Sequence, residues 1–86
     1  MSALDELKKR LSQLAEDSRK VGSDLGRFEQ KFTEQSKKVS AEIGNTSTGV
    51  DKQIIATLQA ASKALEQSIG ALQKASKDCG DFANSL

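Results

Sequence analysis

The 86-residue sequence contains no proline, tryptophan, tyrosine or histidine, and it has only one cysteine and three phenylalanines. Without histidine the chain lacks the commonest general base and metal ligand. With so few aromatic side chains it has little with which to line a substrate pocket, and a single cysteine cannot form an internal disulfide. We therefore expect no enzymatic activity, no metal site and no bound cofactor.

Neither sign of charge dominates, and long apolar runs are missing. Thirteen Lys and Arg stand against twelve Asp and Glu, a net charge of +1, with both signs mixed along the chain. Nucleic-acid binding proteins normally carry a clustered basic surface, so we expect no nucleic-acid partner.

No stretch approaches the roughly 18 apolar residues of a membrane-spanning helix, and residues 1–5 lack the layout of a signal peptide. We expect no membrane association, and any export would use a route without a cleaved leader.

The first half of the chain has a seven-residue apolar period. Ser2 can cap a helix by accepting a hydrogen bond from the amide of Asp5, and from Leu4 onward apolar residues recur at alternating steps of three and four. With Leu4 as heptad position a, nine of the twelve a and d positions from 4 to 42 are apolar, which is typical of a coiled-coil seam. We predict a helix over about 3–43. The apolar a and d residues are Leu4, Leu7, Leu11, Leu14, Val21, Leu25, Phe28, Phe32 and Val39.

The run Gly44-Asn45-Thr46-Ser47-Thr48-Gly49 interrupts this period at the middle of the chain. Gly44 suits the left-handed residue that often ends a helix, and residues 48–51 have the Thr-x-x-acid layout of a helix start. We predict a turn at 44–48, with Gly44 and Gly49, and a second helix over about 49–84; the alternative is one kinked helix. A short connection favours an antiparallel return. Residues 1–86 are thus predicted to form a single all-α domain, an antiparallel two-helix hairpin.

The two apolar seams can be aligned. In the second half Leu58, Leu65, Leu72 and Cys79 lie seven apart. Choosing residue numbers that sum to 93 places Val21 opposite Leu72 and Leu14 opposite Cys79, so that large side chains often meet small ones, as an interdigitated core requires. Cys79 is then a small seam residue, or alternatively a reactive thiol.

One side of the predicted seam is flanked by small and apolar residues at heptad position e, where only Lys8 and Glu29 are charged. We call this set the e strip. Such a strip beside the seam predicts that the hairpin docks a second hairpin or an effector's helical domain as a four-helix bundle, in a homodimer or heterodimer. The alternative is a loose monomer. The e strip consists of Ala15, Gly22, Ser36 and Ile43 in the first helix and Ile55, Ser62, Ile69, Ser76 and Ala83 in the second.

A helical hairpin of just under a hundred residues with its turn at the midpoint resembles the WXG family of small proteins exported by bacterial type VII secretion systems. The family's Trp-x-Gly at the turn falls near Ile43-Gly44-Asn45, where the glycine is present and the tryptophan is absent. Its C-terminal Tyr-x-x-x-acid export signal maps onto residues 82–86, where Phe82 keeps the aromatic ring and the acid is missing. The resemblance implies a protein that is cytoplasmic before export and then secreted, or that holds a larger effector in secretable form.

Two other functions remain open on the residues alone. The chain could serve as a cytoplasmic structural coiled-coil module, or one amphipathic helix could open from the hairpin and bind a lipid surface reversibly. The even charge and the small number of aromatic residues disfavour the lipid-binding function.

Overall fold

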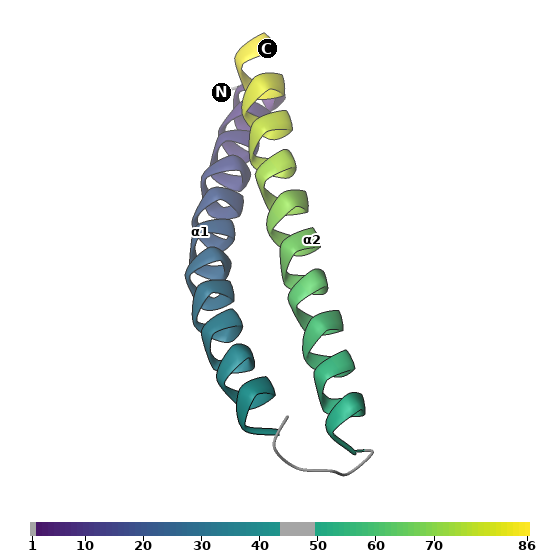
Figure 1. Cartoon of the computed structure of the whole chain (residues 1–86). Coiled ribbons are helices and arrows are strands. Elements are labelled where there is room, and N and C mark those ends of the chain that lie inside the picture. The colour runs from purple at the N-terminus through teal and green to yellow at the C-terminus, as the bar shows by residue number, and fades with distance from the viewer. Residues whose placement is uncertain (1, 44–49) are drawn as a thin grey trace.

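The computed structural model describes residues 2–43 and 50–86, and nearly all of them are helical (Figure 1). Helix α1 runs over Ala3–Ile43 and helix α2 over Val50–Ser85. These bounds lie within one residue of the ranges expected from the sequence. The predicted all-α helical hairpin is confirmed. The predicted turn at 44–48, with Gly44 and Gly49, lies outside the described residues.

The N-terminus of α1 is capped by Ser2. Its Oγ accepts a hydrogen bond from the backbone N of Asp5 at 3.1 Å, and its carbonyl oxygen accepts one from the N of Glu6 at 3.2 Å. Asp5 and Glu6 lie in the first turn, where negative charge interacts favourably with the helix dipole. The helix therefore begins where the sequence predicted, and for the predicted reason.

Ion pairs within single helices line the outward faces. The guanidinium of Arg19 lies 2.7 Å from the carboxylate of Glu16, and the Nζ of Lys74 lies 2.6 Å from Asp78 Oδ2. Hydrogen bonding and charge from Arg19 lower the pKa of Glu16, and the hydrogen bond from Lys74 lowers the pKa of Asp78. All four side chains are exposed, so these pairs support the helices only slightly.

The two helices pack antiparallel into a rod with extents of 67 × 17 × 15 Å, and both chain ends lie at the same end of the rod (Figure 1). Among the described residues the contact between α1 and α2 is the only one between separate elements, so the core is thin. Among the described residues only Ser18, Gly22 and Ala83 are buried. Most large apolar side chains keep part of their surface in water.

The helices meet at nearly the levels along the rod that the sequence predicts. However, α1 is rotated about its own axis relative to the predicted seam of a and d positions. A Cβ atom built on Gly22 lies 3.6 Å from the Cβ of Leu72, and one built on Gly80 lies 3.9 Å from the Cβ of Ala15. Leu72 thus faces Gly22 rather than its neighbour Val21. Because successive residues of a helix point about 100° apart, this offset of one residue brings a different face of α1 against α2.

The prediction that the d positions of α1 lie in the seam is therefore wrong. Leu14, Val21 and Phe28 are 53%, 47% and 53% exposed, whereas Gly22, at position e, is buried. The physical reason is the size of the side chains at position e. Glycine, alanine and serine there let the two backbones approach closely, and larger d residues would hold them apart.

Candidate interaction surface

The e strip, which the sequence predicted to dock a second hairpin, lies along the contact between α1 and α2, and most of its residues keep part of their surface exposed. Ala83 is 1% exposed and Gly22 is buried. The hydroxyl of Ser76 donates a hydrogen bond to the carbonyl oxygen of Ala15 at 2.8 Å. These residues hold the hairpin's own two helices together. The docking of a second hairpin on the strip stays a prediction. The remaining members are half-buried: Ala15, Ser36, Ile43, Ile55, Ser62, Ile69 and Ser76.

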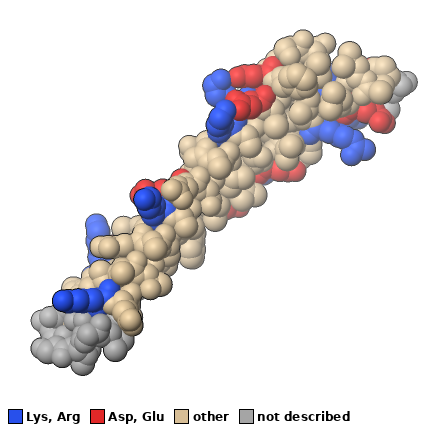
Figure 2. All heavy atoms as spheres, turned by 90° about the vertical axis from the view of Figure 1, so that its right-hand side faces the viewer, with Lys and Arg blue, Asp and Glu red and all other residues tan. Residues whose placement is uncertain are grey.

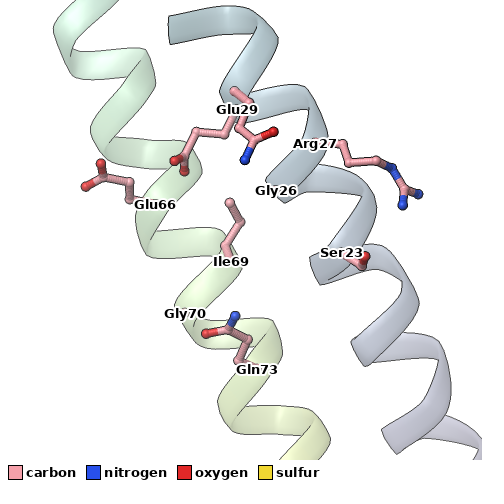
Figure 3. A pocket seen from close by; sticks show the side chains of 9 residues that line it. Ser23, Gly26, Arg27, Glu29, Glu66, Ile69, Gly70 and Gln73 are labelled. Carbon is pink, nitrogen blue, oxygen red and sulfur yellow. The ribbon is translucent and has the colours of Figure 1, made fainter.

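A shallow groove follows the e strip along the surface. Near the middle of the rod it has a volume of about 480 Å³, and Figure 3 shows Ile69 there between the two helices with Glu29 and Glu66 close by. No atom beyond their own helix lies within 4 Å of a Cβ built on Gly26 or Gly70. The groove is open and lined by side chains of mixed charge, and it offers no convergent set of catalytic groups.

The opposite side of the hairpin carries the exposed apolar residues of α1. We call Leu7, Leu14, Val21 and Phe28 the d ridge; they are seven residues apart, so they lie along one face of the helix. Leu7 is 43% exposed, and the ring of Phe28 is tilted against that of Phe32 with 6.0 Å between the ring centres. A monomer rarely leaves so continuous a row of large apolar side chains in water without a function for it. The d ridge is the strongest candidate site on the molecule.

Helix α2 carries small residues on the same side. We call Ala61, Ala64, Ser68, Ala71 and Ala75 the alanine face; they recur at steps of three and four, which places them on one side of the helix. Ala64, Ser68 and Ala71 are exposed, and Ala61 and Ala75 are half-buried. Position d of an antiparallel hairpin points to the same side in both helices, so the alanine face lies next to the d ridge.

This side of α2 is also free of charge over about five turns. Between residues 53 and 73 the only charged residues are Lys63 and Glu66. Helical geometry places Glu66 on the far side of α2 from Ala64 and Ala71, and Lys63 at the margin, about 80–100° around the helix from them. Figure 2, which looks at the hairpin from the α2 side, shows a largely uncharged surface with the charged groups gathered at intervals. Large apolar residues at the chain ends and near the connection extend the exposed surface: Leu4, Val39, Ile54, Phe82 and Leu86.

Two other residues singled out in the sequence have clear positions. Phe82, proposed as the remnant of an export signal, is 51% exposed near the C-terminal end of α2. Cys79 is a half-buried free thiol, at a level close to the contact of Ala15 with Gly80. Its position agrees with a small side chain at the helix contact.

These features define a class: a two-helix hairpin with one uncovered apolar side. No protein-family model, no curated protein and no solved structure matches the chain. Within residues 2–43 and 50–86 no group of three acidic, Cys or His side chains could hold a metal ion. In the same residues neither helix has an apolar stretch long enough to cross a membrane.

The sequence contains the signal for this surface, but the heptad pattern predicts that the d residues lie in the core. Large residues at position d and small residues at position e both flank position a, and either pair of positions can form a helix contact. Counting large apolar residues favours a helix contact made by positions a and d. The packing of small residues favours a and e, and that is the contact the hairpin makes.

Proposed function

We propose that this chain is a non-catalytic interaction protein, a helical hairpin that pairs with another helical element through the d ridge and the alanine face. The exposure of the d ridge carries the proposal. Each of its four side chains keeps about half of its surface in water, and covering that surface contributes on the order of 1 kcal/mol per side chain. A partner helix laid along the ridge would therefore gain several kcal/mol before any polar contact forms.

We further propose that it acts as a WXG-like substrate or effector partner of a bacterial type VII secretion system. The support is the hairpin of 86 residues with helices of similar length, together with an exposed aromatic ring at Phe82 near the C-terminal end. An exposed ring in a short terminal segment is accessible to a receptor. The d ridge would serve at the same time to hold the partner or effector.

Secretion of the full chain tests this proposal. The chain is expressed in a bacterium with an intact type VII machinery and in a matched strain without it, and the culture supernatants are compared. We expect the chain outside the cells only when the machinery is intact, and we expect Phe82→Ala to reduce its export. Leu4→Ala, at an equally exposed apolar position outside residues 82–86, is the control and should leave export unchanged. Retention in both strains would favour a structural coiled-coil module instead.

The pairing itself is tested separately by light scattering. The chain is mixed with candidate helical partners, and the mass of the complex is measured. A mass above that of the single chain supports pairing, and substitution of the ridge residue Val21 by Asp should abolish it. A chain that stays monomeric, with and without partners, at high concentration would contradict the proposal. Co-sedimentation with anionic lipid vesicles under those conditions would instead indicate a lipid-binding helix.

A further inference from the structure

We infer that the hairpin has a second packing, in which both helices turn about their own axes and α2 of the same chain covers the d ridge. In the observed packing, which we call the e packing, positions a and e of the two helices meet. In the second, the d packing, positions a and d meet. The inference rests on the proposed function, because the surface that the d packing conceals is the proposed interaction surface. Exchange between the two packings controls access to it.

The two packings are close in geometry. Positions d and e lie on either side of position a, so a turn of about 50° by each helix exchanges one for the other. Viewed along the rod, the helices turn in opposite senses, because their d positions lie on the same side of the hairpin. Leu72 faces Gly22 in the e packing and Val21 in the d packing. The helices therefore also slide by about one residue, or roughly 1.5 Å, and both stay intact.

The e packing leaves large apolar side chains at position d in water. The d packing covers these side chains and releases mostly small ones from the helix contact, such as Gly22 and Ala83. Because the free energy of burial grows with the apolar area removed from water, this exchange favours the d packing. The side chains at position d that are 47–53% exposed in the e packing are Leu14, Val21 and Phe28 in α1 and Phe82 in α2.

The e packing is stabilised by close contacts instead. The Ser76 hydroxyl donates its hydrogen bond to the carbonyl oxygen of Ala15 at 2.8 Å, and Ala83 is 1% exposed. Both contacts need the two backbones to be close, and the larger residues at position d would hold the backbones apart. Neither packing keeps both the close contacts and the covered ridge. Packed helices switch between such discrete arrangements rather than deform gradually.

Two carboxylates at the groove disfavour the e packing. Glu29 on α1 is half-buried, and Figure 3 shows its side chain pointing toward α2, where Glu66 lines the same groove. The nearby Arg27 points away from them and pairs with Asp24. Like charges on facing helices repel, and the turn of α1 carries Glu29 away from α2. We therefore expect Glu29→Gln to favour the e packing.

Disulfide trapping in the full chain tests whether both packings occur. In a Cys79→Ser background, one variant carries Gly22→Cys with Leu72→Cys, and a second carries Val21→Cys with Leu72→Cys. A Cβ at position 22 lies 3.6 Å from that of Leu72 in the e packing, within the range that a disulfide requires. Positions 21 and 72 face each other in the d packing. In dilute glutathione buffer we expect both variants to form an internal disulfide, measured by mass spectrometry.

The matched control is Ser23→Cys with Leu72→Cys, because Ser23 is the other neighbour of Gly22 and faces α2 in neither packing. The control crosslinks only when the chain opens, so both test variants should react about tenfold faster. Glu29→Gln should slow the reaction of the Val21 variant relative to that of the Gly22 variant. A Val21 variant no faster than the control would show a single packing and overturn the inference.

A tryptophan probe measures what each disulfide does to the d ridge. The chain contains no tryptophan, so Phe28→Trp places a single reporter there. We expect fluorescence emission at longer wavelength when the disulfide joins positions 22 and 72, because the ring is in water, and at shorter wavelength when it joins 21 and 72. Reduction should bring the two emission maxima closer together. Equal maxima in the two oxidised forms would overturn the covering of the ridge.

Binding of a synthetic amphipathic helical peptide, with leucine at its a and d positions, separates this inference from the proposed function. Light scattering should show binding to the chain locked between positions 22 and 72. The chain locked between 21 and 72 should not bind until its disulfide is reduced. Equal binding by both locked forms would overturn the control of access. If neither form binds the peptide or a candidate partner while the emission maxima differ, the proposed function fails and the second packing stands.

Discussion

Ser76 on α2 donates its hydroxyl proton to the backbone carbonyl oxygen of Ala15 on α1, at an Oγ to O distance of 2.8 Å. The two residues are 61 positions apart in the chain. A side chain as short as serine can reach a main-chain oxygen of another helix only where the two backbones are close. This bond therefore reports directly on the small residues at the helix contact.

Removing the Ser76 hydroxyl should destabilise the hairpin. We expect Ser76→Ala to lower the free energy of unfolding by about 1 kcal/mol, the usual value of one partly buried hydrogen bond. The measurement is urea denaturation followed by circular dichroism. Ser12→Ala, at an exposed position of α1, is the control; it should raise the stability slightly, because alanine is the better helix former. Equal effects of the two substitutions would mean that the bond contributes nothing.

Two leucine truncations should separate the helix contact from the outer surface. Leu72 is half-buried against Gly22, and we expect Leu72→Ala to cost about 2 kcal/mol, at the low end for core leucines. Leu14 is exposed, so Leu14→Ala should cost less than about 1 kcal/mol. The measurement is thermal unfolding at protein concentrations low enough that only single chains are present. A larger loss of stability in Leu14→Ala than in Leu72→Ala would support the seam of a and d positions that the sequence predicted.

Two glycines in the groove should be replaceable with a gain in stability. No atom outside the helix lies within 4 Å of a Cβ placed on Gly26 or Gly70, and alanine stabilises a helix interior by up to about 1 kcal/mol relative to glycine. We expect Gly26→Ala and Gly70→Ala each to raise the free energy of unfolding by about 0.5–1 kcal/mol. The gains should add, because the two sites share no contact partner. A loss in either variant would show that the groove is narrower than described.

The pKa of Asp78 should be lower than that of an ordinary aspartate, because the Lys74 amino group donates a hydrogen bond to its carboxylate. A lowered pKa in the folded state favours folding above the pKa of the unfolded chain, and this contribution is lost as the pH falls through the folded value. NMR titration of the carboxyl carbon checks it. Lys74→Met should return the pKa of Asp78 toward its usual value, whereas Lys63→Met should leave it in place. An unchanged titration in Lys74→Met would contradict the assigned cause.

Much of this fold is predictable from the sequence. The apolar period gives two helices, and the cap at Ser2 fixes where α1 begins, because local hydrogen bonding decides helix ends. The levels at which the helices meet follow from pairing large residues with small ones. Gly22 faces Leu72, whereas the sequence predicts Val21 at that place, a difference of one residue along α1.

The orientation of α1 about its own axis, which decides the face that packs against α2, was not predictable from the sequence in the same way. Both the d ridge and the e strip can cover position a, and the sequence of one chain does not say which of them is used within the chain. That choice depends on the total apolar area covered, in the chain and in any assembly it forms. Residues such as Gly22 and Ala83 appear uninformative when hydrophobicity is counted. They decide the contact because they let the backbones approach.

The bond between Ser76 and Ala15 also bears on how the hairpin forms. Near the connection the two helices are joined by a short stretch of chain, whereas Ala15 and Ser76, which are 61 positions apart, meet only after the chain between them has been brought into order. Loop-closure entropy therefore disfavours early contact at that end. Assembly should proceed from the connection toward the end that holds both termini, which closes last.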